Sequence, residues 1–181
     1  NEVNLATAIH RLGKNAGAPQ RSDDDPRLIR GLVEQATLSV AQGSWKSREL
    51  SNVCWAVAKL RLVEPTLFRA IAAEAVKQVR HFKPQALANT AWAFATAGIS
   101  SPALFEAIAA EAPAEMRHFN PQNLANTAWA FATAGISSSR LFEAIAAEAP
   151  AKMRRFNPQD LANTAWAFAT AGKSSLALCE A

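Results

Sequence analysis

The sequence predicts an all-α fold, a right-handed α-solenoid of stacked two-helix repeats, and three observations predict it. The segment LANTAWAFATAG occurs three times without change, beginning at Leu87, Leu124 and Leu161, each 37 residues after the last. A weaker copy, LSNVCWAVAKL, begins 37 residues earlier at Leu50. Half of the residues are apolar and alanine dominates, as expected where helices pack closely. A fixed period of this length indicates stacked structural units rather than one wrapped core.

The period divides residues 1–181, a single solenoid, into one degenerate repeat, three repeats and a partial repeat, over 1–45, 46–82, 83–119, 120–156 and 157–181. The chain begins without Met and ends within a repeat, so we expect it to be a fragment of a longer protein. Its length suits one solenoid and leaves too little for a catalytic domain beside it.

The degenerate repeat is expected to hold two helices. The first lies in NLATAIHRLGK, with Ile9 where later repeats have Trp, and the second in PRLIRGLVEQA from Pro26, which matches PTLFRAIAAEA from Pro65. The polar stretch between them, from Asn15 to Asp25, predicts an unusually long loop.

Residues 83–119 show the elements expected in each later repeat. Pro84 suits the first turn of a helix, and Gly98 is placed as the stop after Ala97. Ser100 or Ser101 can cap a second helix that starts at Pro102 and follows apolar spacing to about residue 112. Pro113 is then expected to break or kink that helix.

The repeated pattern P-x-x-L-A-N-x-x-W-A-x-A resembles that of the octotricopeptide repeat family. The residues that carry the match are Pro84, Leu87, Ala88, Asn89, Trp92, Ala93 and Ala95, then Pro121, Leu124, Asn126 and Trp129, then Pro158, Leu161, Asn163 and Trp166. The resemblance covers nearly all of residues 46–181. It implies paired-helix solenoids that bind RNA in chloroplasts or mitochondria and act in RNA stability, processing or translation. The near-identical copies depart from typical members, whose repeats are more diverged.

A helical wheel of the first helix in repeat 83–119 separates two sides. One is apolar, with Trp92 at its margin, and holds Leu87, Ala88, Ala91, Phe94 and Ala95. The other carries Gln85, Asn89 and Thr96 beside the small residues Ala86 and Ala93. A nucleotide is expected to approach the backbone closely on this second side.

Two columns on that side are candidates for RNA contact. One differs in every repeat and consists of Glu49, Ala86, Asn123 and Asp160; the other is constant and consists of Asn52, Asn89, Asn126 and Asn163. Residues at i and i+3 share a helix face, and a constant amide beside a varying group suits the reading of one base per repeat. The alternatives are that the first column varies because it faces solvent, and that the Asn column bonds the neighbouring repeat's backbone in an internal ladder.

Two further columns recur once per repeat. Arg80, Arg117 and Arg154, followed by His81, His118 and Arg155, form a basic stripe suited to phosphates. Its alternative role is compensation of a helix dipole, or solubility. The tryptophans at 55, 92, 129 and 166 are expected to pack between repeats rather than to stack on bases, because they adjoin the apolar side.

Other classes of function find no motif. The chain has no Gly-rich phosphate loop, metal-ligand spacing or nucleophile motif, so we expect no enzyme activity, cofactor or metal. Cys54 and Cys179 stand where other repeats have Ala91 and Phe142, and are expected to be core residues in a reducing compartment. No apolar run is long enough for a membrane span. The formal charge of +4 is compatible with a polyanionic partner.

The sequence therefore predicts a module that binds single-stranded RNA in an organelle, either chloroplast or mitochondrion. The alternative is a protein-interaction or structural solenoid, a subunit of a large organellar assembly. A basic stripe and varying column on one concave surface would favour RNA, and a stripe on the convex side or in ion pairs would favour the scaffold. An enzyme whose catalytic domain lies outside the fragment is a weaker alternative.

Overall fold

The computed structural model describes residues 1–16, 26–62 and 64–173, and every regular element in them is helical, which confirms the all-α class for that part. The α-helices are α1 (Glu2–Lys14), α2 (Pro26–Ala41), α3 (Ser47–Lys59), α4 (Pro65–Gln78), α5 (Pro84–Ala97), α6 (Pro102–Glu115), α7 (Pro121–Thr133), α8 (Ser139–Lys152) and α9 (Pro158–Thr170). Short 3-10 segments follow three of them: η2 (Val79–His81), η3 (Met116–His118) and η4 (Met153–Arg155). Most of the expected loop Asn15–Asp25, and Cys179, lie outside the described residues.

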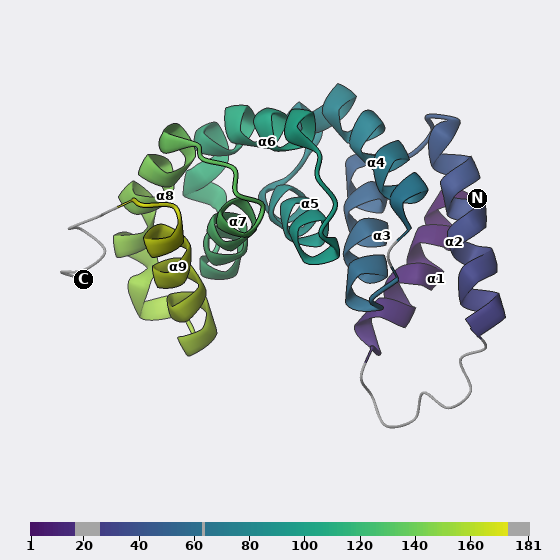
Figure 1. Ribbon diagram of the computed structural model, residues 1–181, viewed down its shortest axis with the longest axis horizontal. Coiled ribbons are helices and arrows are strands. Elements are labelled where there is room, and N and C mark those ends of the chain that lie inside the picture. The colour runs from purple at the N-terminus through teal and green to yellow at the C-terminus, as the bar shows by residue number, and fades with distance from the viewer. Residues whose placement is uncertain (17–25, 63, 174–181) are drawn as a thin grey trace.

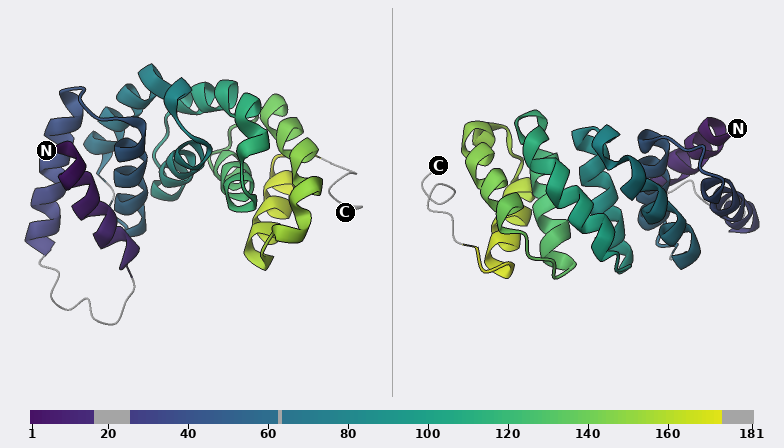
Figure 2. Two further views of the ribbon diagram at one scale, coloured as in Figure 1. Left: turned by 180° about the vertical axis from the view of Figure 1, so that it is seen from behind. Right: turned by 90° about the horizontal axis from the view of Figure 1, so that it is seen from above.

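The described helices form two rows along an arch. Figure 1 shows α1, α3, α5, α7 and α9 on the inside of the arch, here called the inner row, and α2, α4, α6 and α8 on the outside, the outer row. The views from behind and from above show the same order (Figure 2). Neighbours in the inner row contact each other far more extensively than neighbours in the outer row. The inner row is therefore the concave side.

The inner helices begin and end where the sequence predicts. Pro84 opens α5, and Gly98 follows its end in the left-handed conformation (φ 66°) that glycine adopts without strain. In α7 and α9 the side chains of Asn120 and Asn157 cap the helix by accepting from the backbone N–H three residues on, each at 2.8 Å.

The expected break at Pro113 is wrong. Helix α6 continues through Pro113 to Glu115, and α8 continues through Pro150 to Lys152. Helix α4, which has Val76 at the same position, is also 14 residues long. The proline stands in the last turn, where it interrupts little of the helix, and a 3-10 segment then tightens the chain.

Phenylalanines join successive repeats through the core. The rings of Phe68 and Phe94 meet edge to face with centroids 4.9 Å apart. Phe105 and Phe131 do the same at 4.9 Å, and Phe142 and Phe168 at 5.1 Å. Each pair links an outer helix to the inner helix of the next repeat, in the geometry that aromatic rings prefer.

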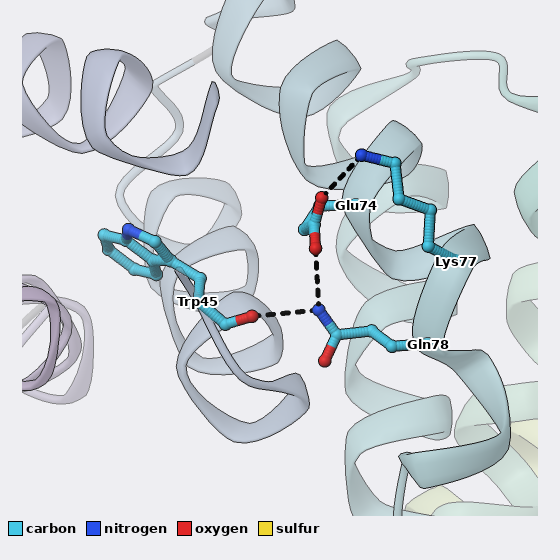
Figure 3. Close-up of polar contacts among 4 residues, drawn as sticks. All are labelled: Trp45, Glu74, Lys77 and Gln78. Carbon is cyan, nitrogen blue, oxygen red and sulfur yellow. Dashed lines mark hydrogen bonds and ion pairs between the residues drawn. The ribbon is translucent and has the colours of Figure 1, made fainter. Parts of the chain in front are cut away.

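Polar bonds tie the end of each of two outer helices to the preceding repeat. Gln78 Nε2 donates to the carbonyl oxygen of Trp45 at 2.9 Å and to Glu74 at 3.2 Å, and Glu74 also pairs with Lys77 at 2.9 Å (Figure 3). Lys152, which holds the same repeat position as Gln78, donates to the carbonyls of Met116 and Arg117 at 3.2 and 2.9 Å. The amide and the ammonium thus satisfy carbonyls that the helices leave free.

Candidate nucleic-acid interface

A polar groove of about 520 Å³ opens on the inner row at its N-terminal end. Its walls come from α1, α3 and α5, the η2 connection and one residue of α7. Most of the lining side chains are polar or basic: His10, Lys14, Ser47, Arg48, Ser51, Asn52, Trp55, His81, Lys83, Gln85, Asn89 and Gln122. Among the described residues that line the groove, none is acidic.

One strip of each inner helix remains accessible, and we call it the inner stripe. Its members recur at i, i+4, i+7 and i+11, which places them on one face. In α5 the inner stripe is Gln85, Asn89, Trp92 and Thr96; in α7 it is Gln122, Asn126, Trp129 and Thr133; in α9 it is Gln159, Asn163, Trp166 and Thr170. In α3 it is Arg48, Asn52, Trp55 and Lys59.

The expected open side of small residues is wrong. Ala93 is fully buried and Ala86 is 8% exposed, while Trp92 shares the inner stripe with Asn89 instead of lying at the core margin. A helix in the inner row has a neighbour on each flank and an outer helix behind it. Only a narrow strip is left, and it is centred on Asn89 and Trp92.

The varying column is mostly buried. Asn123 and Asp160 are each 6% exposed, Ala86 is also buried, and Glu49 is half-buried. Asp160 accepts from the backbone N–H of Asn157 at 3.4 Å and completes a capping box with it. The interpretation that this column varies because it faces solvent is therefore wrong for these three buried residues, and a base could reach little of their side chains.

The constant Asn column lies on the surface of the inner row with its amides unpaired. The side chains of Asn52, Asn89, Asn126 and Asn163 are half-buried, and none makes a hydrogen bond to a residue that the structure describes. The internal ladder expected as an alternative is thus absent from this part of the chain. An amide offers two donors and an acceptor, so each of these groups can bind a ligand.

The tryptophans pack against one another along the inner row. The rings of Trp92 and Trp129 have centroids 6.5 Å apart and planes inclined by 33°, which confirms the predicted packing between repeats for this pair. A base inserted between two parallel rings needs them about 6.8 Å apart, twice the stacking rise. The observed pair therefore offers ring edges and outer faces rather than a slot.

The first helix departs from the sequence alignment by one residue. Ile9 was expected to replace Trp, but Ile9 is buried in the core and His10 occupies the position beside Trp55, with ring centroids 5.4 Å apart. His10 therefore extends the aromatic column to α1.

The basic stripe lies beside the groove and not in it. Arg80, Arg117, Arg154 and Arg155 are exposed on the 3-10 segments. Arg80 Nε and Arg117 Nε each donate to the Nε2 of the following histidine, at 3.3 and 2.9 Å. From the same connection, His81 and Lys83 line the groove.

The cations that do line the groove were missed from the sequence. Lys14 and Arg48 replace the Thr and Gln that the later inner stripes carry at those positions, and Lys83 precedes α5. Burial first, and then the charges of Lys14 and Arg48, hold the pKa of His10 below its usual range. The groove is thus positive, and the missed signal was the exchange of neutral for basic residues in two columns.

Two further properties concern only the described part of the chain. No group of His, Cys, Asp or Glu side chains there is arranged to hold a metal ion. None of the helices in that part has the length and apolar character needed to cross a bilayer.

The chain belongs to the RESC6 family, described as RNA-editing substrate-binding complex 6 protein, because the family model matches residues 21–173. No curated protein sequence matches the chain. The family match supports the coarser expectation of a helical protein from an RNA-associated family. It gives no support to the octotricopeptide assignment or to a chloroplast setting.

Proposed function

We propose that this member of the RNA-editing substrate-binding complex 6 family binds single-stranded RNA along its inner row, as part of an RNA-editing assembly. One observation carries the proposal: unpaired cations and unpaired amides meet in a single groove on the concave side. The family's name supports RNA as the ligand.

The amides supply contacts for bases. Asn52 and Asn89 both line the groove, and an amide can donate to and accept from a base edge at once. Trp55 lies between them on the groove wall and offers part of its ring for stacking. Unstacked bases of a single strand present both their edges and their faces, whereas a duplex hides them.

The cations supply contacts for phosphates. Lys14, Arg48 and Lys83 line the groove, and none of them is in an ion pair within the described residues. Phosphate binding by such groups releases counterions, so the affinity depends on salt. The exposed Arg80, Arg117 and Arg154 extend the positive surface beyond the groove.

The proposal includes a right-handed solenoid with a 37-residue period and a role without catalysis. The starts of α5, α7 and α9 at Pro84, Pro121 and Pro158 support that period. A mitochondrial location is proposed over a chloroplast one, because RNA-editing complexes are mitochondrial.

A salt-dependent binding experiment tests RNA binding. A random single-stranded RNA pool is titrated at two salt concentrations with the wild type and with K14A/R48A. We expect the double variant to bind more weakly and to lower the salt slope by about two, one for each lost phosphate contact. The matched control is R30A/R69A, which removes two exposed cations from the outer helices α2 and α4 and should leave the slope unchanged.

A second comparison tests the basic stripe. Replacing Arg80, Arg117 and Arg154 by alanine should weaken binding at low salt without changing base preference. No RNA binding by the wild type at low salt would reject the proposed function.

A protein-binding or structural role is the second candidate, and the end of the inner row favours it. Leu161 and Trp166 on α9 are 42% and 47% exposed, and unpaired amides in a line also suit the backbone of an extended peptide. Failure to bind RNA, together with specific cross-linking to protein subunits through Trp166, would favour this candidate.

A further inference from the structure

The three C-terminal repeats present the same accessible side chains to a ligand. Their inner stripes each consist of Gln, Asn, Trp and Thr, beginning at Gln85, Gln122 and Gln159. In all three the glutamine is exposed and the asparagine is half-buried without a protein partner. The stripes are therefore equivalent in chemistry as well as in position.

The residues that do differ between these repeats within the inner helices are turned inward. The varying column holds Ala86, Asn123 and Asp160, and all three are buried. Asp160 serves in a capping box with Asn157, and the backbone of Asn123 bonds to the side chain of Asn120. This variation changes how each helix starts and leaves the inner stripe the same.

From these two observations we propose that α5, α7 and α9 together select a run of three identical nucleotides. The inference rests on the proposed RNA binding and adds the class of RNA. Helical repeats that read RNA use two or three side chains per base, and each inner stripe offers two amides and a ring. Three equal sets of contacts have equal preferences, so one kind of base is favoured at all three.

The N-terminal end of the inner row differs and does not read that run. The inner stripe of α3 has Arg48 and Lys59 in place of Gln and Thr, and α1 contributes Lys14. These cations contact phosphates, which are the same for every base. The run is therefore selected by the C-terminal three repeats, and the adjoining groove strengthens binding regardless of sequence.

Homopolymers test this inference directly. Nine-nucleotide RNAs of A, C, G and U, and one mixed sequence of the same length, are compared by fluorescence anisotropy in one lithium buffer. Equal length gives equal phosphate number, so the electrostatic contribution cancels. We expect one homopolymer to bind about tenfold or more tightly than the mixed sequence, since a good amide contact discriminates by at least that factor.

Variants connect the preference to the inner stripe. N126D replaces a donor by an acceptor at nearly constant size, and should reduce the preference for the favoured homopolymer about tenfold. Q122E on the exposed start of the same inner stripe is the second variant, in case N126D alters folding, which thermal unfolding reports. E106Q on the outer helix α6 is the control and should bind as the wild type does.

The outcomes separate this inference from the proposed function. Tight binding of all five RNAs with equal affinity would overturn the selection of a run and leave RNA binding intact. A preference that survives both N126D and Q122E in folded protein would overturn the role of the inner stripe. No binding of any RNA at low salt would overturn both.

Discussion

Gly13 marks the closest approach between the first two inner helices. A Cβ atom added there would lie 2.6 Å from both the Cα and the Cβ of Ala56 on α3. Such a contact cannot be relieved by turning a side chain, because neither group has one that turns. The absence of a Cβ is thus what lets α1 pack directly on α3.

We expect G13A to lower the free energy of unfolding by about 1–3 kcal/mol, because overpacking forces the helices apart. Urea denaturation measures the change. The matched control is G31A in α2, where an added Cβ meets nothing within 4 Å. That control should raise the free energy of unfolding by about 0.5–1 kcal/mol, the usual gain for alanine in a helix. Equal effects at the two glycines would contradict the close approach.

His10 links RNA binding to pH. Its pKa is lowered by burial and by the charges of Lys14 on α1 and Arg48 on α3, so the free protein holds it neutral near pH 7. A bound phosphate would offset those charges and raise the pKa, and the complex would then take up a proton. Affinity for RNA should therefore increase as the pH falls from about 7.5 through the usual histidine range near 6.5.

The comparison of wild type and H10Q between pH 7.5 and 5.5 measures this coupling. H10Q should show a smaller rise in affinity, with the remainder due to His81 on η2, which lines the same groove. Identical pH profiles for the two proteins would show that no phosphate binds beside His10.

Single residues also show how far sequence reasoning reaches at this scale. The periodicity predicts that Asn89 and Gln85 are polar neighbours, and they are. It does not predict that Ala93 is covered, because coverage comes from a neighbouring helix 37 residues away in sequence. The displacement of the aromatic position from Ile9 to His10 likewise depends on how α1 packs against α3.

At the scale of the element, the ends of the outer helices decide how repeats are joined. The same repeat position holds Gln78, Glu115 and Lys152, yet only the first and last reach the preceding repeat. Glu115 is exposed, and a carboxylate cannot donate to a carbonyl. The three repeats are thus joined unequally at this position.

We expect K152A to cost about 1 kcal/mol of stability or somewhat more, because it removes charged donors from the carbonyls of Met116 and Arg117. The same change also removes the ion pair with Glu148, whose contribution is small at this exposure. E115A is the matched control at the same repeat position and should change stability by less than about 0.5 kcal/mol. Thermal unfolding of both variants measures the difference, and equal losses would mean that the bonds across the repeat contribute nothing.

The boundaries of helices follow from the sequence except where two rules compete. Pro84 and Gly98 act as start and stop, since each satisfies a demand of one helix end. Pro113 obeys its rule only locally: it lacks an N–H, but so near the end of α6 the loss of one bond does not end the helix. The sequence alone does not show how much of the helix follows the proline.

At the scale of the whole molecule, the near-identity of repeats allows one of them to be removed. Deleting residues 83–119 joins Phe82 to Asn120, which reproduces the Phe119–Asn120 junction of the intact chain. In a stacked array each repeat contacts only its neighbours, so the shortened chain keeps every type of interface.

The deletion protein should fold with the same helical circular dichroism per residue, and with lower stability because one interface is lost. Its favoured RNA should be shorter by one nucleotide, which competition with oligonucleotides of stepped length measures. Loss of helical structure would show that the 37-residue unit is not the structural repeat.

The candidate site could be predicted only in part, for a physical reason. The sequence supplies the Asn column, because that column is constant at a fixed spacing. It does not supply the groove, which combines Lys14 of α1, Arg48 of α3 and Lys83 before α5. Those cations break the repeat pattern, so a reading based on sameness passes over them.

The tight inner row and the loosely contacting outer row give the arch a direction of compliance. When a curved rod bends, its length stays constant along the neutral axis, and that axis lies near the stiffer side. Here the stiffer side is the inner row, where adjacent helices pack along one another. Thermal flexing would open and close the outer row while the spacing between Asn89, Asn126 and Asn163 stays nearly fixed. The inner stripes then behave as marks on a ruler that bends without stretching.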